Sequence, residues 1–310
     1  MEKIKLSLVV PVYYEEDCIR QFLKETKEVL DKLDIDYEYM FIDDGSKDKT
    51  TYIIKEEAAS NKKIKLVELS YNHGKQAAVT AGINYATGTH LIYMDPDLQD
   101  PPIEIPRFLE EMAKGYDVVY GIRREKKDNF INKIYSGIFW GVLRRFTGLE
   151  IPKGLAVMRM FNRKFANMFV QYKEQNRFIE GIFMHIGLKS SQLEIDQRER
   201  FSGVSKFNFK RKMNLAFDAI FDFSETPLKM AVRMGVALTC FGILGIIGLA
   251  FAKLFLLNFQ AGWLSIISVI TIATGLQIFF IGLAAMYIGR VYKETKQSPL
   301  YSVKETTNID

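Results

Sequence analysis

Two long apolar stretches near the C-terminus constrain the fold more than any other feature of this 310-residue sequence. Residues 231–257 and 263–289 are almost entirely apolar, and each exceeds the roughly 20 helical residues that cross a bilayer. Only NFQAG separates them, so we expect an antiparallel helical hairpin whose outer ends return to the same side. The alternative is a pair of buried helices in a large soluble core, but soluble core helices of this length rarely lack a polar face.

The charges around the two stretches predict their orientation. The connecting loop has no charge, whereas basic residues accompany the outer ends: Lys229, Arg233, Arg290, Lys293 and Lys296. By the positive-inside rule, both termini and the whole N-terminal domain are expected in the cytoplasm. Apart from Arg233 at the start of the first span, Lys253 is the one charge inside a span. We expect its side chain to reach the headgroups near the connecting loop, with a functional role as the alternative.

Two further stretches mix basic and aromatic residues, as is typical of helices that lie on an anionic membrane surface. They are residues 129–148 and 207–229, and an amphipathic helix packed on its own domain explains either one equally well. The sequence therefore predicts three parts. These are a cytoplasmic domain at 1–200, a juxtamembrane segment at 201–230, and the hairpin with a cytoplasmic tail at 231–310.

The N-terminal part alternates predicted strands with helical patterns. Apolar runs typical of strands occupy residues 6–13, 37–46, 63–70, 89–95 and 117–123. This alternation predicts an α/β fold with a mostly parallel sheet covered by helices on both faces. Ligands of such sheets bind beyond the carboxyl ends of the strands. No GxGxxG follows the first strand and no GxxxxGK[ST] is present, which disfavours a dinucleotide-binding Rossmann site and a P-loop.

Charged residues follow the apolar runs directly and mark the expected site. The residues concerned are Glu15, Asp44, Lys75, Asp95, Asp97 and Arg123. Asp95 and Asp97 are separated by one residue after a buried strand, so they can share one divalent cation. Mg²⁺ and Mn²⁺ prefer carboxylate oxygens and keep positions open for phosphate. We predict a metal site at Asp95, Asp97 and Gln99, with a solvated turn as the alternative.

Composition narrows the classes of partner. The net charge of +5 and the pI of about 8.9 suit an anionic partner such as nucleic acid, a membrane surface or a phosphorylated substrate. Basic residues cluster near the expected membrane surface rather than in a groove with stacking aromatics, which disfavours nucleic acid. Cys18 and Cys240 show no disulfide or zinc spacing, which favours a reducing setting, and His73, His90 and His185 show no metal-binding pattern. The first apolar run is too short for a signal peptide.

Five motifs occur in order between residue 6 and about residue 206: VVPVYYEE, IDDGSKDKT, NHGKQAAVTAG, MDPDLQDPP and RERFSGVSK. Together they resemble the family 2 glycosyltransferases that use polyprenyl phosphate as acceptor. That group includes dolichol-phosphate mannose synthase and the bacterial undecaprenyl-phosphate glycosyltransferases, and the two-span hairpin resembles the bacterial branch. The resemblance implies a GT-A-like domain and transfer of a sugar from a nucleotide-diphosphate sugar to the lipid phosphate, with inversion.

The resemblance also implies a nucleotide site. Pro11, Glu15 and Asp44 would hold the base and the ribose, and Lys75 and Asp95 would lie beside the nucleotide. Glu15 and Asp44 have a simpler alternative role as helix N-caps, because a predicted helix follows each of them. The expected nucleotide is UDP rather than GDP, by analogy with the bacterial relatives.

Three basic residues and a serine would complete the site. The resemblance implies that Arg123, Arg200, Ser205 and Lys206 contact phosphate on the lipid or the diphosphate. Asp97, Arg123, Arg200 and Lys206 are therefore the expected catalytic residues, helped by a Mg²⁺ or Mn²⁺ ion that offsets the charge of the leaving diphosphate. Lys206 has an alternative role as part of the basic membrane face.

One position departs from the family pattern. Many bacterial relatives carry an acidic residue where this sequence has Val157, in the stretch GLAVMRMFNR, whereas the arginine of that motif is kept as Arg159. The lipid phosphate is anionic near neutral pH, so attack by it needs no strong general base. Loss of the acidic residue is therefore chemically tolerable, although the sugar or acceptor pocket is expected to differ.

Two other functions compete with polyprenyl-phosphate glycosyl transfer. A polysaccharide synthase with a sugar acceptor usually has more spans and a further motif that this sequence lacks. A catalytically idle membrane scaffold is opposed by the retained Asp95, Asp97, Arg200 and Lys206. UDP-glucose and UDP-N-acetylglucosamine are the expected donors, and undecaprenyl phosphate is the expected acceptor. The sequence does not determine the oligomeric state, and a homo-oligomer is one possibility.

Overall fold

The computed structural model describes residues 4–124, 141, 151–175, 177–198, 201, 226–255 and 262–309. Its elements, in chain order, are β1 (Lys5–Val12), α1 (Ile19–Leu30), β2 (Asp36–Asp43), α2 (Thr50–Ser60), β3 (Ile64–Leu69), α3 (Lys75–Tyr85), β4 (His90–Tyr93), the 3₁₀ turn η1 (Pro102–Glu104), α4 (Ile105–Ala113), β5 (Val118–Arg123), β6 (Leu155–Asn162), α6 (Arg163–Phe169), α7 (Ile179–His185), β7 (Ser190–Ile195), α9 (Thr226–Phe255), α10 (Trp263–Thr295) and β8 (Val303–Thr307).

An eight-stranded sheet in the order β7-β5-β6-β4-β1-β2-β3-β8 organises the domain. The four strands β4, β1, β2 and β3 are parallel neighbours, and β5 is parallel to β7. Two strands, β6 and β8, run antiparallel to the strands beside them. The predicted mostly parallel α/β fold is thus confirmed, and the five predicted strands match β1 to β5 to within three residues at each end.

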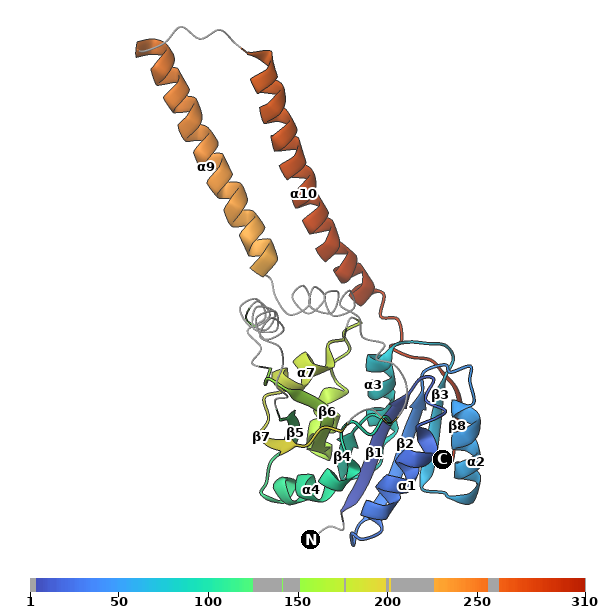
Figure 1. Ribbon diagram of the computed structural model, residues 1–310. Helices are drawn as coiled ribbons and strands as arrows, with labels where there is room; N and C mark the ends of the chain where they lie inside the picture. The colour runs from blue at the N-terminus through green and yellow to red at the C-terminus, as the bar shows by residue number, and fades with distance from the viewer. Residues whose placement is uncertain are drawn as a thin grey trace.

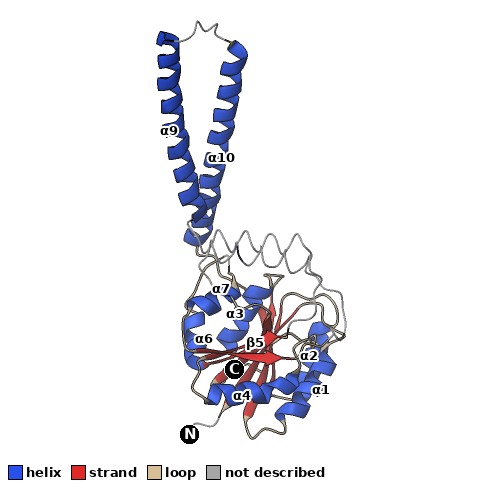
Figure 2. Ribbon diagram, turned by 60° about the vertical axis from the view of Figure 1, so that its left-hand side comes forward, coloured by secondary structure: helices blue, strands red, loops and turns tan. Residues whose placement is uncertain are grey.

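Helices cover both faces of the sheet (Figure 2). Successive side chains of a strand point to opposite faces, so Leu8 and Val10 of β1 enter one core and Val9 enters the other. The first core contains residues of α1, α2 and α4, such as Phe22, and the second contains residues of α3, α6 and α7, such as Phe183. This double cover explains why β1 is buried along nearly its whole length.

The two apolar helices α9 and α10 project from one side of the domain (Figures 1 and 2). The windows Leu228–Gly245 and Val269–Thr295 have mean hydropathies of 1.5 and 2.1, yet only 0% and 6% of their residues are buried. Each helix is therefore long and apolar enough to cross a membrane and is not the core of a soluble fold. The hairpin prediction is confirmed. Helix α9 begins five residues before the first predicted span, and α10 ends six residues after the second.

Some predicted features lie outside the described residues. Apart from residue 141 and residues 226–229, which begin α9, the two stretches expected at the membrane surface belong to this part of the chain. The same holds for three predicted site residues: Arg200, Ser205 and Lys206. The chain after α10, expected as a tail, instead supplies strand β8 at the sheet edge next to β3.

Candidate active site at the carboxyl ends of the parallel strands

The carboxyl ends of four parallel strands meet at one edge of the sheet, on the side from which α9 and α10 project (Figure 1). Val12 of β1 is in register with Asp43 of β2, and Val9 of β1 is in register with Tyr93 of β4. The loops after these strands therefore begin side by side. These loops and the start of α3 carry six of the predicted site residues: Glu15, Asp44, Lys75, Asp95, Asp97 and Gln99.

Asp44 is the first residue after β2, and the loop after β3 holds its side chain in place. Its side chain is buried, with the residue only 3% exposed. Its Oδ1 atom accepts a hydrogen bond from the backbone N–H of His73 at 2.7 Å, and Oδ2 accepts one from Gly74 at 2.9 Å. Gly74 has φ of 93°, a conformation that glycine adopts without steric cost.

Burial raises the pKa of Asp44 to about 6, although the two backbone hydrogen bonds act in the opposite direction. Each carboxylate oxygen has a second lone pair, so Asp44 can still accept hydrogen bonds from a ligand. Hydroxyl groups of a ribose, or the N–H of a base, are donors that fit this carboxylate. The pKa shift shows that the fold holds an acidic group where the ionised form is costly.

The loop after β1 is tied to the loop after β2. The backbone N–H of Tyr14 donates to Ser46 Oγ at 3.0 Å, and that of Glu15 donates to Thr50 Oγ1 at 2.9 Å. Tyr14 has φ of 56°, a left-handed conformation that turns the chain sharply after Pro11 and the end of β1. Glu15 is thus part of the same loop cluster as Asp44, and Pro11 lies next to it in the last residues of β1, in register with Ile42.

The alternative role of Glu15 and Asp44 as helix caps is wrong. Helix α1 has Cys18 at its N-cap position and α2 has Lys49, and neither makes a side-chain capping bond. Both helices begin several residues after the acidic side chains. The position of the two carboxyl groups at the strand ends therefore needs another explanation, and ligand binding supplies one.

The loop after β4 holds its two aspartates in different surroundings. Asp95 forms an ion pair with Lys75, with 2.7 Å between Oδ2 and Nζ. Burial alone would lower the pKa of Lys75, but Asp95 raises it above its usual value. Asp97 is only 5% exposed, and its Oδ1 accepts the N–H of Gln99 at 3.1 Å across a turn in which Leu98 has φ of 59°. A solvated turn does not match the burial of Asp97.

The donor atoms of this loop fit a hard divalent cation. Within the described ranges, no three His, Cys, Asp or Glu side chains cluster closely enough to hold a metal by themselves. Asp95 and Asp97 offer two carboxylates from one loop. Mg²⁺ typically takes one or two protein carboxylates, with substrate phosphates and water completing its coordination. The fit is to a metal that arrives with a phosphate-bearing substrate.

Asp100 is a site residue that the sequence analysis missed. Its Oδ1 accepts a hydrogen bond from Arg123 Nε at 3.1 Å and lies 3.0 Å from Arg123 Nη2 in an ion pair. Its Oδ2 accepts the backbone N–H groups of Val157 and Met158 at 3.0 and 2.9 Å. Asp100 thus joins the β4 loop to β5 and β6. The signal was present in the sequence, because Asp100 is the third aspartate of DPDLQD.

Arg123 is held in place by this pair rather than standing alone. The two-pronged contact with Asp100 uses two of its five N–H donors, and its side chain stays 26% exposed. Its expected contact with phosphate stays a prediction. Val157, at the position of the missing acidic residue, meets the site through its backbone N–H on Asp100.

Arg159 lies under the site and is almost fully buried, at 1% exposure. Its Nε donates to Val157 O at 3.1 Å, and its guanidinium lies 3.7 Å from Glu180 and 5.4 Å from the centre of the Tyr93 ring. A buried guanidinium needs such partners, because an unpaired charge in a protein interior is costly. Arg159 therefore supports β4 and β6 next to the Asp95 loop.

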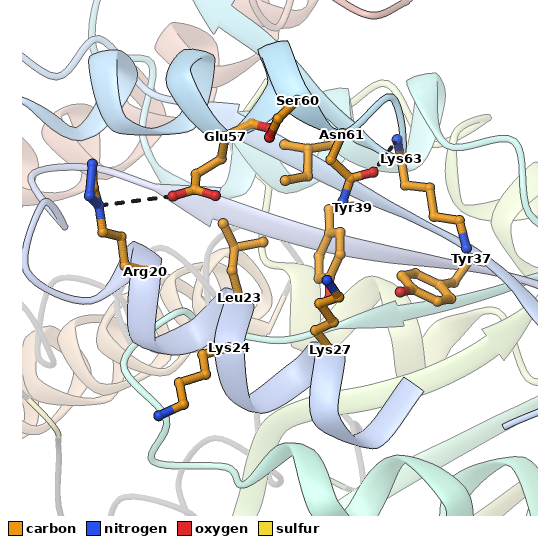
Figure 3. Close-up of a pocket in the computed structure, with 11 residues that line it drawn as sticks. Arg20, Leu23, Lys24, Lys27, Tyr37, Tyr39, Glu57, Ser60, Asn61 and Lys63 are labelled. Atoms are coloured by element: carbon orange, nitrogen blue, oxygen red, sulfur yellow. Dashed lines mark hydrogen bonds and ion pairs between the residues drawn. The ribbon is translucent and has the colours of Figure 1, made fainter. Parts of the chain in front are cut away.

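One cavity lies at the other end of the sheet (Figure 3). It measures about 510 Å³ and is bounded by α1, α2 and the first residues of β2 and β3, with Arg20, Tyr37 and Lys63 among its lining residues. Tyr37 is the second residue of the strand that ends at Asp43, so it lies about 20 Å from Asp43 along the strand, at some 3.3 Å per residue. No predicted site residue lines it.

A second cavity, of about 340 Å³, lies beside the carboxyl end of β3. His73, Gly74 and Lys75 line it from the β3 loop, together with Gln175, Arg177 and Leu300 from the later chain. This cavity adjoins the backbone groups that hold Asp44. The candidate site therefore lies at the carboxyl ends of the strands, as open parallel sheets generally place it.

Known glycosyltransferases resemble this chain over most of its length. Residues 7–169 match the family model described as glycosyl transferase family 2. The uncharacterized glycosyltransferase YkcC of Bacillus subtilis (strain 168) is 35% identical over 99% of this chain and 95% of its own length. An undecaprenyl-phosphate 4-deoxy-4-formamido-L-arabinose transferase of Pseudomonas fluorescens (strain Pf0-1) is 32% identical over 97% of this chain and 89% of its own.

A solved structure described as a mycobacterial protein shares the fold of the domain. It superimposes with a TM-score of 0.50 and 19% identity, over 70% of this chain and 73% of the other. The strand-end site, the family model over more than half of the sequence and the full-length relatives all lead to one assignment. The chain belongs to glycosyl transferase family 2.

Proposed function

We propose that this glycosyltransferase moves a sugar from a nucleotide-diphosphate sugar to polyprenyl phosphate in a membrane. The expected donor is UDP-glucose or UDP-N-acetylglucosamine, and the expected acceptor is undecaprenyl phosphate. The observation that carries the proposal is the shared sheet edge at which the Asp44 and Asp95–Asp97 loops meet, facing the side of the two apolar helices (Figure 1). A relative named for transfer involving undecaprenyl phosphate matches 97% of the chain, a coverage that includes both helices.

The nucleotide would lie against the first two loops. Asp44 would accept hydrogen bonds from the ribose or the base, in a position held by the N–H groups of His73 and Gly74. Pro11 and Glu15 would border the base, since the β1 loop is bonded to the β2 loop. Lys75 would lie where the diphosphate begins.

The diphosphate would lie against the loop after β4. A Mg²⁺ or Mn²⁺ ion, held by Asp95 and Asp97 with Gln99 beside them, would neutralise the diphosphate and ease its departure. The chain itself keeps Asp97 buried and oriented by the Gln99 N–H, and positions Arg123 through Asp100. These residues need no rearrangement of solvent when charge develops on the leaving group.

In the proposed reaction, an oxygen of the lipid phosphate forms a bond to the anomeric carbon of the sugar. The bond from that carbon to the nucleotide diphosphate breaks, and the diphosphate leaves with the electron pair. Attack from the face opposite the leaving group inverts the anomeric centre. The acceptor oxygen is already ionised near neutral pH, so no side chain has to remove a proton.

Two basic side chains and a serine after β7 would close over the two phosphates. Arg200, Ser205 and Lys206 are the proposed contacts. Support comes from both sides of residues 199–200, because the N–H of Arg198 donates to Gln99 O at 2.9 Å and that of Phe201 donates to Asp97 O at 3.1 Å. The described chain therefore passes directly along the loop that carries the proposed metal ligands.

The membrane would hold the lipid phosphate at the height of the site. We propose that α9 and α10 both cross the membrane, with both termini and the catalytic domain in the cytoplasm, as the basic residues at the outer ends favour. Binding the acceptor in the plane of the membrane restricts the search to two dimensions and orients the headgroup. The proposed domain limits remain 1–200, 201–230 and 231–310, with β8 contributed by the last part to the sheet of the first.

The test is a reconstituted reaction with the detergent-purified full chain. Undecaprenyl phosphate, Mn²⁺ or Mg²⁺ and single UDP- or GDP-sugars are combined, and lipid products are identified by mass spectrometry. We expect a sugar linked to the lipid through one phosphate with one donor, a loss of at least 100-fold in rate in Asp97→Ala, and an unchanged rate in Asp34→Ala. Asp34 is an exposed aspartate between α1 and β2, at the opposite end of the sheet.

Two results would contradict the proposal in different ways. If the protein binds UDP with metal but transfers none of the sugars, the acceptor or donor class is wrong. If folded protein neither binds UDP nor turns over any donor, the chain is a membrane scaffold with a glycosyltransferase fold.

A further inference from the structure

The chain that follows α10 returns to the catalytic domain and closes one edge of its sheet (Figure 1). We call residues 296–308 the C-terminal strap. Within it, β8 pairs antiparallel with β3, with Thr307 opposite Leu66 and Val303 opposite Leu69. The direction of pairing brings the start of β8 to the carboxyl end of β3. The strap therefore enters the sheet at the carboxyl end of β3, on the side where the nucleotide loops begin.

Contacts along the strap hold it in this register. The side-chain Nδ2 of Asn308 donates to the backbone carbonyls of Ala58 and Ile64 at 2.9 and 2.8 Å. Lys55 of α2 forms an ion pair with Glu305 at 2.8 Å. These bonds fasten the far end of the strap to the end of α2 and the start of β3.

The near end of the strap contacts the loop after β3. The N–H of Ser70 donates to Ser302 O at 2.9 Å, and the two serine hydroxyls lie 2.5 Å apart. His73 Nε2 lies 3.1 Å from Ser302 Oγ and accepts the Ser302 N–H at 3.3 Å. The imidazole also stacks on the Tyr71 ring, with 3.9 Å between ring centres. The side chain of His73 is thus fixed by Ser302 on one side and Tyr71 on the other.

The backbone of the same histidine belongs to the nucleotide site. Its N–H donates to Asp44 Oδ1, and the next N–H, of Gly74, donates to Oδ2. Burial lowers the pKa of His73, which favours the neutral imidazole that can accept the Ser302 N–H. One residue therefore joins the strap, through its ring, to Asp44, through its backbone.

Gln175 of the catalytic domain contacts both the last turn of α10 and the start of the strap. Gln175 donates its backbone N–H to Glu294 Oε1 at 2.8 Å and its side-chain Nε2 to Ser298 O at 2.6 Å. Further along, Asn84 of α3 donates to the Tyr301 hydroxyl at 2.9 Å. A continuous series of contacts thus runs from the last turn of α10 through the strap to the β3 loop.

We propose that Ser302 and His73 are positioning residues, through which the C-terminal strap holds the β3 loop in the conformation that lets Asp44 bind the nucleotide. This inference rests on the proposed function for the identity of the ligand. It adds that the segment leaving the membrane helix completes the nucleotide site. The strap would act on donor binding and leave the chemical step alone, because it contacts neither the Asp95–Asp97 loop nor Arg123 in the described residues.

Steady-state kinetics and UDP titration of full-length variants test the inference. Ser302→Ala removes the hydroxyl, and His73→Phe keeps the stacked ring but removes both nitrogens. We expect each variant to raise the KM of the donor and the Kd of UDP about 3- to 10-fold with kcat within twofold. The losses in the double variant should be smaller than the sum of the two single losses, because both changes remove the contact between Ser302 Oγ and His73 Nε2. Ser302→Thr, which keeps the hydroxyl, should restore binding, and Thr306→Ala, an exposed change on β8, is the matched control.

Hydrogen exchange supplies a reading that needs no ligand. The peptide that contains the His73 and Gly74 amides should exchange faster in Ser302→Ala than in the wild type, and Thr306→Ala should leave it unchanged. Equal exchange and equal Kd in Ser302→Ala and wild type would overturn the inference. So would parallel losses of kcat, affinity and melting temperature in Ser302→Ala and Thr306→Ala, which would make the strap a general support of the sheet. If the wild type binds no UDP, the proposed function fails while the exchange comparison still decides the role of the strap.

Discussion

Asp44 is a residue whose burial lowers the stability of the fold while its carboxylate is available to bind a ligand. The fold buries this carboxyl group and raises its pKa to about 6, which means that the ionised form costs free energy in the folded state. The two N–H groups of His73 and Gly74 reduce this cost without removing it. A ligand that donates hydrogen bonds to the carboxylate would supply the remaining stabilisation.

We predict that UDP binding weakens as the pH falls through the pKa of Asp44. The carboxyl group is almost fully ionised at pH 7.5 and about a quarter ionised at pH 5.5, so the Kd for UDP should rise about fourfold over this range. Titration calorimetry with UDP across this range measures the change. The phosphate of UDP also titrates near pH 6, so Asp44→Asn, in which only the phosphate titrates, is the reference. Parallel pH profiles of the two proteins would contradict the assignment.

The same shift has the opposite sign for stability. Because the folded pKa of Asp44 lies above its ordinary value, the folded state binds more protons than the unfolded state between about pH 4 and 6. The free energy of unfolding contributed by this group therefore falls as the pH rises through that range. Asp44→Asn should melt at a higher temperature than the wild type at pH 7.5, although it binds UDP less tightly.

At the scale of elements, the site depends on loops packed against each other rather than on single helices. The loop after β2 touches the loop after β3 at Gly45, which has φ of 78°. A Cβ at this position would lie 2.8 Å from the carbonyl carbon of Tyr71 and 2.9 Å from the backbone nitrogen of Asn72. Both neighbours are backbone atoms, so neither can move aside as a flexible side chain would.

We predict that Gly45→Ala separates the two loops and weakens UDP binding at least tenfold. Gly115→Ala is the matched control, because Gly115 has φ of 83° but no atom within 4 Å of its Cβ position. The control should lose only the strain of the left-handed conformation, about 1 kcal/mol, and keep its affinity. Calorimetric titration and thermal melts of both proteins separate steric displacement from strain. Equal effects of the two substitutions on Kd would show that the loop contact does not matter for binding.

At the scale of the whole molecule, the hairpin, the strap and the sheet edge form one connected structure. The two apolar helices leave the domain on the side of the strand ends, and the chain returns from α10 directly to the β3 edge (Figure 1). Sequence separation between paired residues of β3 and β8 exceeds 230 positions. The membrane part and the nucleotide site are therefore linked by a short path in space.

The proposed topology predicts which positions face the cytoplasm. In a Cys18→Ala, Cys240→Ala background, single cysteines are introduced as Ala261→Cys between the spans and Thr306→Cys on β8. A membrane-impermeant maleimide should label only the Ala261→Cys variant in intact cells. In inverted vesicles it should label only the Thr306→Cys variant. Labelling of both cysteines from the same side would rule out two crossing helices.

The sequence by itself determined the local features of this protein. Periodicity and apolar length predicted the first five of the eight strands, the helices between them and the hairpin, because each depends on neighbours within a few residues. The tertiary structure decided which distant groups meet. Asp100 on Arg123, His73 on Ser302 and the strap on β3 join segments from about 20 to more than 200 residues apart. Such contacts depend on how the packed elements direct each side chain, and no local pattern records that direction.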